Sequence, residues 1–317
     1  MAPIFSVHKC SAEEVEHCFY GWSKTERWNP GLDGQDILQV YYDMDPQGFF
    51  VGKVEEASSN KKPVSIISGV RHSEDIAWLG YYVALPEYRG KGYGLSVFKR
   101  ALERVADAPS VGLDGLIPQV ENYKKSGFKT ISWENQRRVG PVEEAVTKLT
   151  ADPSIRTVDA SEVALDEIVA LEHRYGGFKR PLFVSRWLKF HKDRSDDGRF
   201  AIAAVKGDQV IGYACVRPAT ESYRVGPLYA ENREIAETLL KRLAELVLEG
   251  LSSPSNRVPD SVSRTLHLDI CMKNKDAVAL FDGLEWGSIF SSMRMWRGQE
   301  PKTDAAGVFV VTSLEIG

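Results

Sequence analysis

Glycines at alternate positions make residues 89–94, RGKGYG, the stretch of the sequence best suited to binding a phosphate. They stand between an apolar segment and an amphipathic one. Glycine admits backbone conformations that other residues avoid, so successive N–H groups can point into one concavity, where the positive end of the following helix attracts an anion. The pattern predicts a pyrophosphate site. A glycine-rich turn with no ligand is the alternative.

Two other phosphate motifs do not fit this spacing. The dinucleotide fingerprint GxGxxG would need a glycine where Leu95 stands, and a P-loop would need serine or threonine where Gly92 stands. The turn therefore belongs to neither class of nucleotide site.

The surroundings of the turn suggest a family. An apolar strand, Arg-x-x-Gly-x-Gly and a long helix together resemble motif A of the GCN5-related N-acetyltransferases, and Arg89, Gly92 and Gly94 meet its signature. The resemblance implies that the loop binds the pyrophosphate of acetyl-CoA, while the strand before it splays from its neighbour and holds the pantetheine arm through its backbone. The implied loop residues are Arg89, Gly90, Lys91, Gly92, Tyr93, Gly94 and Leu95, and the implied strand residues are Tyr82, Val83 and Ala84.

A second stretch, NYKKSGF, resembles motif B of the same family through Tyr123, Gly127 and Phe128. The resemblance implies that Tyr123 is the acid that serves the departing thiolate; a core aromatic residue is the alternative. Many family members carry an asparagine where this chain has Leu116. We expect Asn122 or Gln119 to supply that polar contact.

Acetyl transfer to an amine also requires a base, because a lysine-like amine with a pKa of about 10.4 is neutral only about once in 10³ molecules at pH 7. The candidates are Asp33 and Asp36 in WNPGLDGQD, and Asp114 in GLDGL. For each of them a surface or capping carboxylate is the alternative. The residues expected to contact the acceptor are Trp28, Asn29, Asp33, Asp36 and, from the second half, Tyr229; those expected to act in catalysis are Tyr123 and Asp114.

The elements that must position these residues occur twice along the 317 residues. The length suits two domains of about 150 residues each. The order of strands, hairpin, long helix, strand and short helix in the first half partly repeats in the second. We therefore predict an α/β fold of the α+β type, made of two tandem acetyltransferase folds, each a mixed, mostly antiparallel sheet flanked by helices. Residues 1–150 are the expected catalytic domain and residues 151–317 the second.

The second half lacks the chemistry of the first. Its connection GPLYAENRE has no alternating glycines, and Phe281 stands where the first half has Tyr123. We therefore predict a degenerate second domain and one acetyl-CoA per chain. This domain either covers the acceptor site or is purely structural. Blocks in both halves, such as RWNPGLDGQD and RMWRG, resemble those of tandem proteins of the bacterial YitH type.

Composition limits the partners. A net charge of -4 gives no basic surplus for nucleic acid, and no run approaches the length of a membrane span. Four scattered cysteines and six isolated histidines form no metal-ligand spacing, so buried reduced thiols and no metal are expected. We expect a cytoplasmic N-acetyltransferase, monomer or homodimer, that uses acetyl-CoA to modify a small-molecule amine by direct transfer in a ternary complex. A non-catalytic CoA-binding sensor or structural protein is the alternative, and O-acetylation or a longer acyl donor stays open.

Overall fold

A computed structural model describes residues 4–55, 61–192 and 195–317 of the chain. Its strands form one continuous mixed sheet in the order β1-β2-β3-β4-β5-β12-β6-β11-β13-β10-β9-β8-β7. The strands are β1 Ile4–Lys9, β2 Phe49–Glu55, β3 Lys61–Arg71, β4 Ile76–Ala84, β5 Ser110–Leu116, β6 Thr130–Pro141, β7 Arg156–Asp159, β8 Phe200–Lys206, β9 Gln209–Pro218, β10 Tyr223–Ala230, β11 Thr265–Cys271, β12 Ser288–Gly298 and β13 Val308–Val310. β4 with β5 and β10 with β11 pair in parallel, and the other pairings between these strands are antiparallel. The expected mixed, mostly antiparallel sheet is confirmed.

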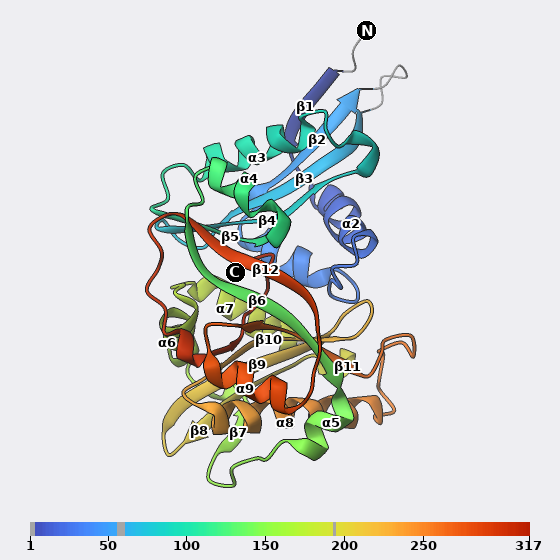
Figure 1. The fold of residues 1–317 in the computed structure, drawn as a ribbon. Coiled ribbons are helices and arrows are strands. Elements are labelled where there is room, and N and C mark those ends of the chain that lie inside the picture. Colours follow the sequence, from blue (N-terminus) through green and yellow to red (C-terminus); the bar gives the residue numbers. More distant parts are fainter. Residues whose placement is uncertain (1–3, 56–60, 193–194) are drawn as a thin grey trace.

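Helices cover both faces of this sheet (Figure 1). They are α1 Ala12–Glu14, α2 Gly21–Thr25, α3 Tyr93–Arg104, α4 Val120–Lys125, α5 Val142–Lys148, α6 Leu165–Leu171, α7 Pro181–Lys192, α8 Arg233–Leu251 and α9 Lys275–Gly283, with wider helical turns at η1 Val15–Tyr20, η2 Ile37–Tyr42 and η7 Glu172–Gly176. α3 packs on one side of the first half, and α5, α8 and α9 form a similar layer in the second. None of the described helices is long and apolar enough to cross a membrane.

The first helical run begins where the sequence indicates. Ser11 accepts a hydrogen bond from the Glu14 backbone, and the Glu14 side chain accepts one in return from the Ser11 backbone. This capping box satisfies two N–H groups at the helix start that would otherwise lack partners.

The two halves share a core on the other face of the sheet. Tyr41 of η2 stacks near Phe183 and Trp187 of α7, with ring centroids 6.4 and 6.0 Å apart. All three side chains are buried, in one apolar cluster that continues through both halves. The sequence does not reveal α7, because the loop-like GGFK segment precedes it and its apolar face meets residues more than a hundred positions away.

The central strands are exchanged between the halves. β12, from the second half, lies between β5 and β6, while β6 of the first half pairs with β12 and with β11. In Figure 1 these two long strands cross the middle of the molecule, one green and one red. Arg294 lies opposite Asp114 where β12 pairs with β5, and Leu268 lies opposite Arg138 where β11 pairs with β6.

Each parallel strand pair diverges along its length. β4 and β5 are paired from Ile76↔Ser110 to Leu79↔Leu113, and no further pairs follow in the described sheet. β10 and β11 diverge in the same way, but there β13 fills the gap and pairs with both of them. The first half therefore keeps an open divergence, whereas the second half closes its own.

Candidate active site

The glycine turn links β4 to α3 and has the geometry that the sequence predicts. Gly90 and Gly92 have φ angles of 75° and 82°, in the region that favours glycine. Gly92 caps α3 without any side-chain hydrogen bond. Because the first turn of a helix has N–H groups without intrahelical partners, those of α3 are available to an anion.

Arg89 supports the turn from within. Its Nε donates to the Ala84 carbonyl at 2.8 Å, and its guanidinium pairs with Glu26 at 3.0 Å. Lys91 lies over the ring of Tyr88, and Leu95, on the first turn of α3, is half exposed. Arg89 thus fixes the entry to the loop rather than projecting freely toward a phosphate.

The corresponding connection in the second half is capped by its own chain. Asn232 accepts a hydrogen bond from the Ile235 backbone at 3.0 Å, and this occupies the start of α8. Phe281, the counterpart of Tyr123, is fully buried. The side-chain cap and the β13 strand account physically for the lack of a second phosphate turn and strand gap.

The end of β4 lies at the divergence. A bulge interrupts its pairing with β3 between Gly80 and Val83, and Tyr81 has a φ of 51°, which is rare for a tyrosine. Val83 and Ala84 return to pairing with β3 on that side, while β5 offers them no partner on the other. The backbone of residues 82–84 thus has no β5 partner on the edge that the resemblance assigns to pantetheine, and the Ala84 carbonyl accepts from Arg89.

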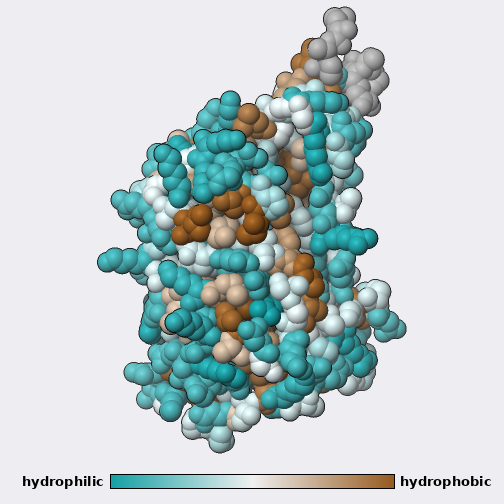
Figure 2. Space-filling view, in the orientation of Figure 1, coloured by the Kyte–Doolittle hydropathy of each residue, from teal (hydrophilic) through white to brown (hydrophobic). Residues whose placement is uncertain are grey.

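A cavity of about 420 Å³ occupies this divergence and draws its walls from both halves. Its lining residues are Glu26, Arg27, Trp28, Ile67, Leu79, Gly80, Tyr81, Tyr82, Phe98, Leu113, Asp114, Leu116, Tyr123, Arg137, Ile289, Phe290, Leu314 and Glu315. Figure 2 shows apolar side chains gathered at mid-height of this face, over α4, β5 and β12. Leu116 and Ile289, which are 44% and 63% exposed, belong to the rim.

Tyr123 projects from the short helix α4 into the cavity wall. Its ring lies against Gly115 and has its centroid 6.1 Å from that of Phe98. Burial, together with the neighbouring Tyr82, raises the pKa of Tyr123. Asn122, one position earlier, is exposed and donates to Gln119 at 2.8 Å, so its side chain is turned to its own helix.

Asp114 lines the cavity but is fully engaged. Arg294 of β12 donates to both of its oxygens, at 3.0 and 2.7 Å, and Asn135 donates at 2.9 Å. Burial raises the pKa of Asp114, and the charge of Arg294 opposes that rise. A carboxylate with both oxygens held in this way is poorly placed to take a proton, so the geometry argues against the base role expected from the sequence and indicates a joint between β5 and β12.

The WNPGLDGQD segment reaches the cavity only through Trp28. Asn29 donates to Ser222 at 2.7 Å, Asp33 pairs with Arg199 at 2.8 Å, and Asp36 pairs with Arg217 at 3.0 Å. All three partners belong to the second half. The segment therefore joins the halves, and the polar residues expected to meet the acceptor bind protein instead.

Tyr229 is likewise absent from the cavity lining. It is buried among Tyr175 and Tyr213, with its hydroxyl 3.3 Å from that of Thr312. The second half reaches the cavity through other residues, Ile289, Phe290, Leu314 and Glu315. Sequence reasoning missed them because only strand exchange and the return of residues 311–317 bring them there.

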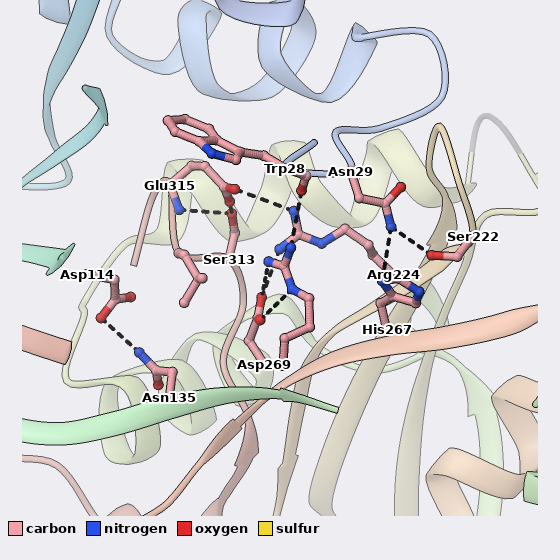
Figure 3. Close-up of polar contacts among 12 residues, drawn as sticks. Trp28, Asn29, Asp114, Asn135, Ser222, Arg224, His267, Asp269, Ser313 and Glu315 are labelled. Atoms are coloured by element: carbon pink, nitrogen blue, oxygen red, sulfur yellow. Dashed lines mark hydrogen bonds and ion pairs between the residues drawn. The ribbon is translucent and has the colours of Figure 1, made fainter. Parts of the chain in front are cut away.

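Two arginines and two carboxylates form a buried cluster beside Trp28 (Figure 3), and two of these residues, Arg137 and Glu315, line the cavity. Arg137 donates to both oxygens of Asp269 at 2.8 Å, and Arg224 donates to one of them at 2.9 Å. Glu315 lies 3.5 Å from Arg224. Despite burial, these arginines lower the pKa of Asp269 to about 2 and lower that of Glu315.

The described residues show no group of histidine, cysteine and acidic side chains that could hold a metal ion. All four cysteines are buried and unpaired, as the sequence predicts.

Two family models match the chain, one in each half. Residues 13–128 match the acetyltransferase (GNAT) family, and residues 168–252 match an acetyltransferase (GNAT) domain. Both matches fall on the strands and helices described above.

Similar proteins cover nearly the whole chain. Holothin acyltransferase from Pseudoalteromonas sp. (strain SANK 73390) is 32% identical over 296 residues, which are 93% of this chain and 89% of that protein. In fold, the chain is similar to a putative acetyltransferase from Pyrococcus horikoshii, with a TM-score of 0.74 and 17% identity over 99% of this chain and 96% of the other. It is also similar to a tandem GNAT protein from the clavulanic acid biosynthesis pathway, with a TM-score of 0.64 and 14% identity over 94% and 100%. The chain belongs to the GNAT family of acyltransferases and carries two such domains in tandem.

Proposed function

We propose that the protein transfers an acyl group, acetyl from acetyl-CoA, to the amine of a small molecule, directly and within a ternary complex. The observation that carries the proposal is the cavity at the β4–β5 divergence, which has Tyr123 in its wall and whose lining residue Tyr82 lies against Gly94 of the glycine turn. The second half covers it through β12 and the residues after β13. Residues 1–150 then supply the acyl-donor site, and residues 151–317 serve to close it.

The residues present fit acyl-CoA. Positive φ angles at Gly90 and Gly92 and the uncapped start of α3 suit a pyrophosphate, and the edge of residues 82–84, which has no β5 partner, suits the amides of a pantetheine arm. Acyl-CoA supplies the activated acyl carbon. An N–H group of the β4 edge is positioned to stabilise negative charge on the carbonyl oxygen.

Tyr123 is suited to act as a hydrogen-bond donor to sulfur. Its raised pKa keeps the hydroxyl protonated at neutral pH, whereas a thiol has a pKa near 8.5. Complete proton transfer to a thiolate is therefore unfavourable, and donation of a hydrogen bond that stabilises the departing thiolate is the role that this pKa supports. Solvent then completes the protonation.

The acceptor should be small and carry an apolar body. A cavity of about 420 Å³ that both halves enclose suits a small molecule better than a protein side chain on a folded surface. The aromatic side chains of Trp28, Tyr81 and Phe290 contribute to its walls. Because one relative is named for acylation of holothin, holothin should be among the acceptors tried.

Thiol release tests the proposal. The protein is incubated with acetyl-CoA, or with longer acyl-CoA, and a panel of aromatic amines, aliphatic amines, amino sugars, alcohols and holothin. Acceptor-dependent release of free thiol, with the amide identified by mass, supports the N-acyltransferase. Tight acetyl-CoA binding without release across the panel would favour the sensor instead, and ester products would redirect the proposal to O-acylation.

A further inference from the structure

Three carboxylates line the cavity, and they differ in how they are held. Asp114 has no exposed side-chain surface and is bound through both oxygens by Arg294. Glu26 pairs with Arg89 at 3.0 Å, on the side of the glycine turn. Glu315 keeps 11% of its side chain exposed; one of its oxygens lies 3.5 Å from Arg224, and the other accepts a hydrogen bond from the Ser313 hydroxyl. Of the three, Glu315 is the one that combines a position beside the end of β4 with an oxygen whose one arginine contact is long.

The backbone holds Glu315 at the point where β4 leaves β5. The Leu314 carbonyl accepts a hydrogen bond from the indole of Trp78 at 3.1 Å. A Cβ atom at Gly80 would collide with the Glu315 carbonyl oxygen, so only glycine allows this approach. The carboxylate is thus fixed beside the last paired residues of β4, next to where the acyl carbon must lie if the β4 edge binds pantetheine.

The charges around Glu315 come from several elements. Arg224 on β10 and Arg137 on β6 face it, with Asp269 of β11 beyond them and the hydroxyls of Tyr81, Tyr41 and Ser313 nearby. The two arginines and the Ser313 hydroxyl lower its pKa, so the carboxylate is ionised at neutral pH. Asp269 takes most of the hydrogen bonds of Arg137 and Arg224, which leaves Glu315 charged, with a long contact to Arg224 on one oxygen and the Ser313 hydroxyl on the other.

We propose that Glu315, carried into the cavity by the second half, binds the acceptor amine and accepts its proton; this rests on the proposed function. As the amine nitrogen forms its bond to the acyl carbon, one N–H proton passes to a Glu315 oxygen. The C–S bond then breaks and its electron pair leaves on sulfur. The carboxylic acid returns its proton to solvent, and the thiolate takes one up, so the sum is amine plus thioester to amide plus thiol.

The test compares Glu315→Gln with Glu249→Gln in the full chain. Glu249 also pairs with an arginine, at the exposed end of α8, and an exposed pair of this kind contributes little to stability. The measurements are kcat and KM for amines of graded pKa, the dissociation constant of acetyl-CoA by calorimetry, and the urea midpoint. We expect kcat/KM of Glu315→Gln to fall by roughly 10²-fold or more for basic amines, with acetyl-CoA affinity unchanged, and to fall much less for weakly basic amines, which need less help in losing a proton.

Each outcome decides the proposal. Wild-type kcat/KM in Glu315→Gln, or an equal loss for all amines, overturns the base role and leaves the proposed function standing. No turnover by the wild type with acetyl-CoA bound overturns the proposed function, and this inference with it. If Glu315→Gln fails to fold, Glu315→Asp replaces it, because the shorter side chain keeps the charge but moves it away from the amine. A loss of kcat in Glu315→Asp that grows with the pKa of the amine supports the proposal. Full activity of Glu315→Asp contradicts it.

Discussion

Gly92 is one of the two residues of the glycine turn, with Gly90, that have a positive φ. Its φ of 82° strains any residue with a Cβ atom, yet a Cβ there would meet no atom within 4 Å. We expect Gly92→Val to weaken acetyl-CoA binding by at least about tenfold, because strain of about 1–3 kcal/mol must be relieved by turning N–H groups away from the ligand. Calorimetric titration measures the affinity.

The matched control for this change is Gly283→Val, at the end of α9. Gly283 also has no atom within 4 Å of an added Cβ, and its φ is not in the positive region. It should bind acetyl-CoA as the wild type does. Equal affinity in Gly92→Val and the wild type would remove the turn from the donor site.

Tyr123 is the second residue whose role can be isolated. Tyr123→Phe should lower kcat by roughly 10²-fold or more, because the departing thiolate loses its hydrogen-bond donor. Since its pKa is raised, the hydroxyl keeps its proton through about pH 9, and the factor between wild type and variant should stay constant from about pH 7 to pH 9. Steady-state rates across this range measure it.

Tyr42→Phe serves as the control for Tyr123→Phe. It removes a hydroxyl that donates to the Cys10 carbonyl at 3.2 Å, outside the cavity. A ratio between wild type and Tyr123→Phe that shrinks steadily above about pH 7 would mean that Tyr123 ionises in that range and would contradict its assigned state.

Local motifs explain which residues could be predicted. The glycine turn and Tyr123 lie in short segments whose spacing alone carries the signal; Tyr123 lines the cavity, and Gly94 of the turn lies against Tyr82, which lines it too. Asp33 and Asp36 stand in an equally local segment, but they form ion pairs with Arg199 and Arg217, which are more than 160 positions away. A sequence pattern cannot distinguish a carboxylate reserved for substrate from one paired across a fold.

Among the elements, the joint between β5 and β12 depends on a buried ion pair. Arg294 and Asp114 are 1% and 0% exposed and come from opposite halves. We expect Arg294→Met to lower the free energy of unfolding by about 3–5 kcal/mol, since it leaves a buried carboxylate without its partner. Urea unfolding followed by tryptophan fluorescence measures the loss.

A double variant separates the pair from simple packing. Arg294→Met combined with Asp114→Leu removes both charges, and most of the lost stability should return. A double variant no more stable than Arg294→Met would show that the arginine acts through its contacts with Trp78 and Trp133 rather than through its charge.

At the scale of elements, most strands and helices follow from alternating or helical apolar patterns. The hairpin of β8 and β9, the long helix α8, the strand β11 and the short helix α9 occur in the order that the sequence predicts for the second half. β13 could not be predicted, because three residues carry no periodicity and the strand exists only where β10 and β11 leave a gap for it. The exchange of β6 and β12 could not be predicted either, because the pairing partner of a strand depends on all the other strands of the sheet and not on its own sequence pattern.

At the scale of the whole molecule, the exchanged strands make the folding of each half depend on the other. Among the described strands, β6 pairs with β11 and β12, and both belong to residues 151–317. The first half alone would present β6 and the free side of β5 as unpaired edges, which favour aggregation. We expect residues 1–150 expressed alone to yield no folded monomer, and co-expression with residues 151–317 to restore a one-to-one complex that binds acetyl-CoA.

The exchanged strands and the shared core predict one cooperative unfolding transition for the full chain. The core around Tyr41 and Trp187 spans both halves, and so do β6 and β12, so neither half can lose its structure without exposing apolar surface of the other. Circular dichroism, fluorescence at the tryptophans and acetyl-CoA binding should report the same urea midpoint. Two separated unfolding transitions would show that the halves are independent domains. A folded monomer of residues 1–150 with wild-type affinity for acetyl-CoA would show the same, and it would mean that the first half alone forms the acetyl-CoA site.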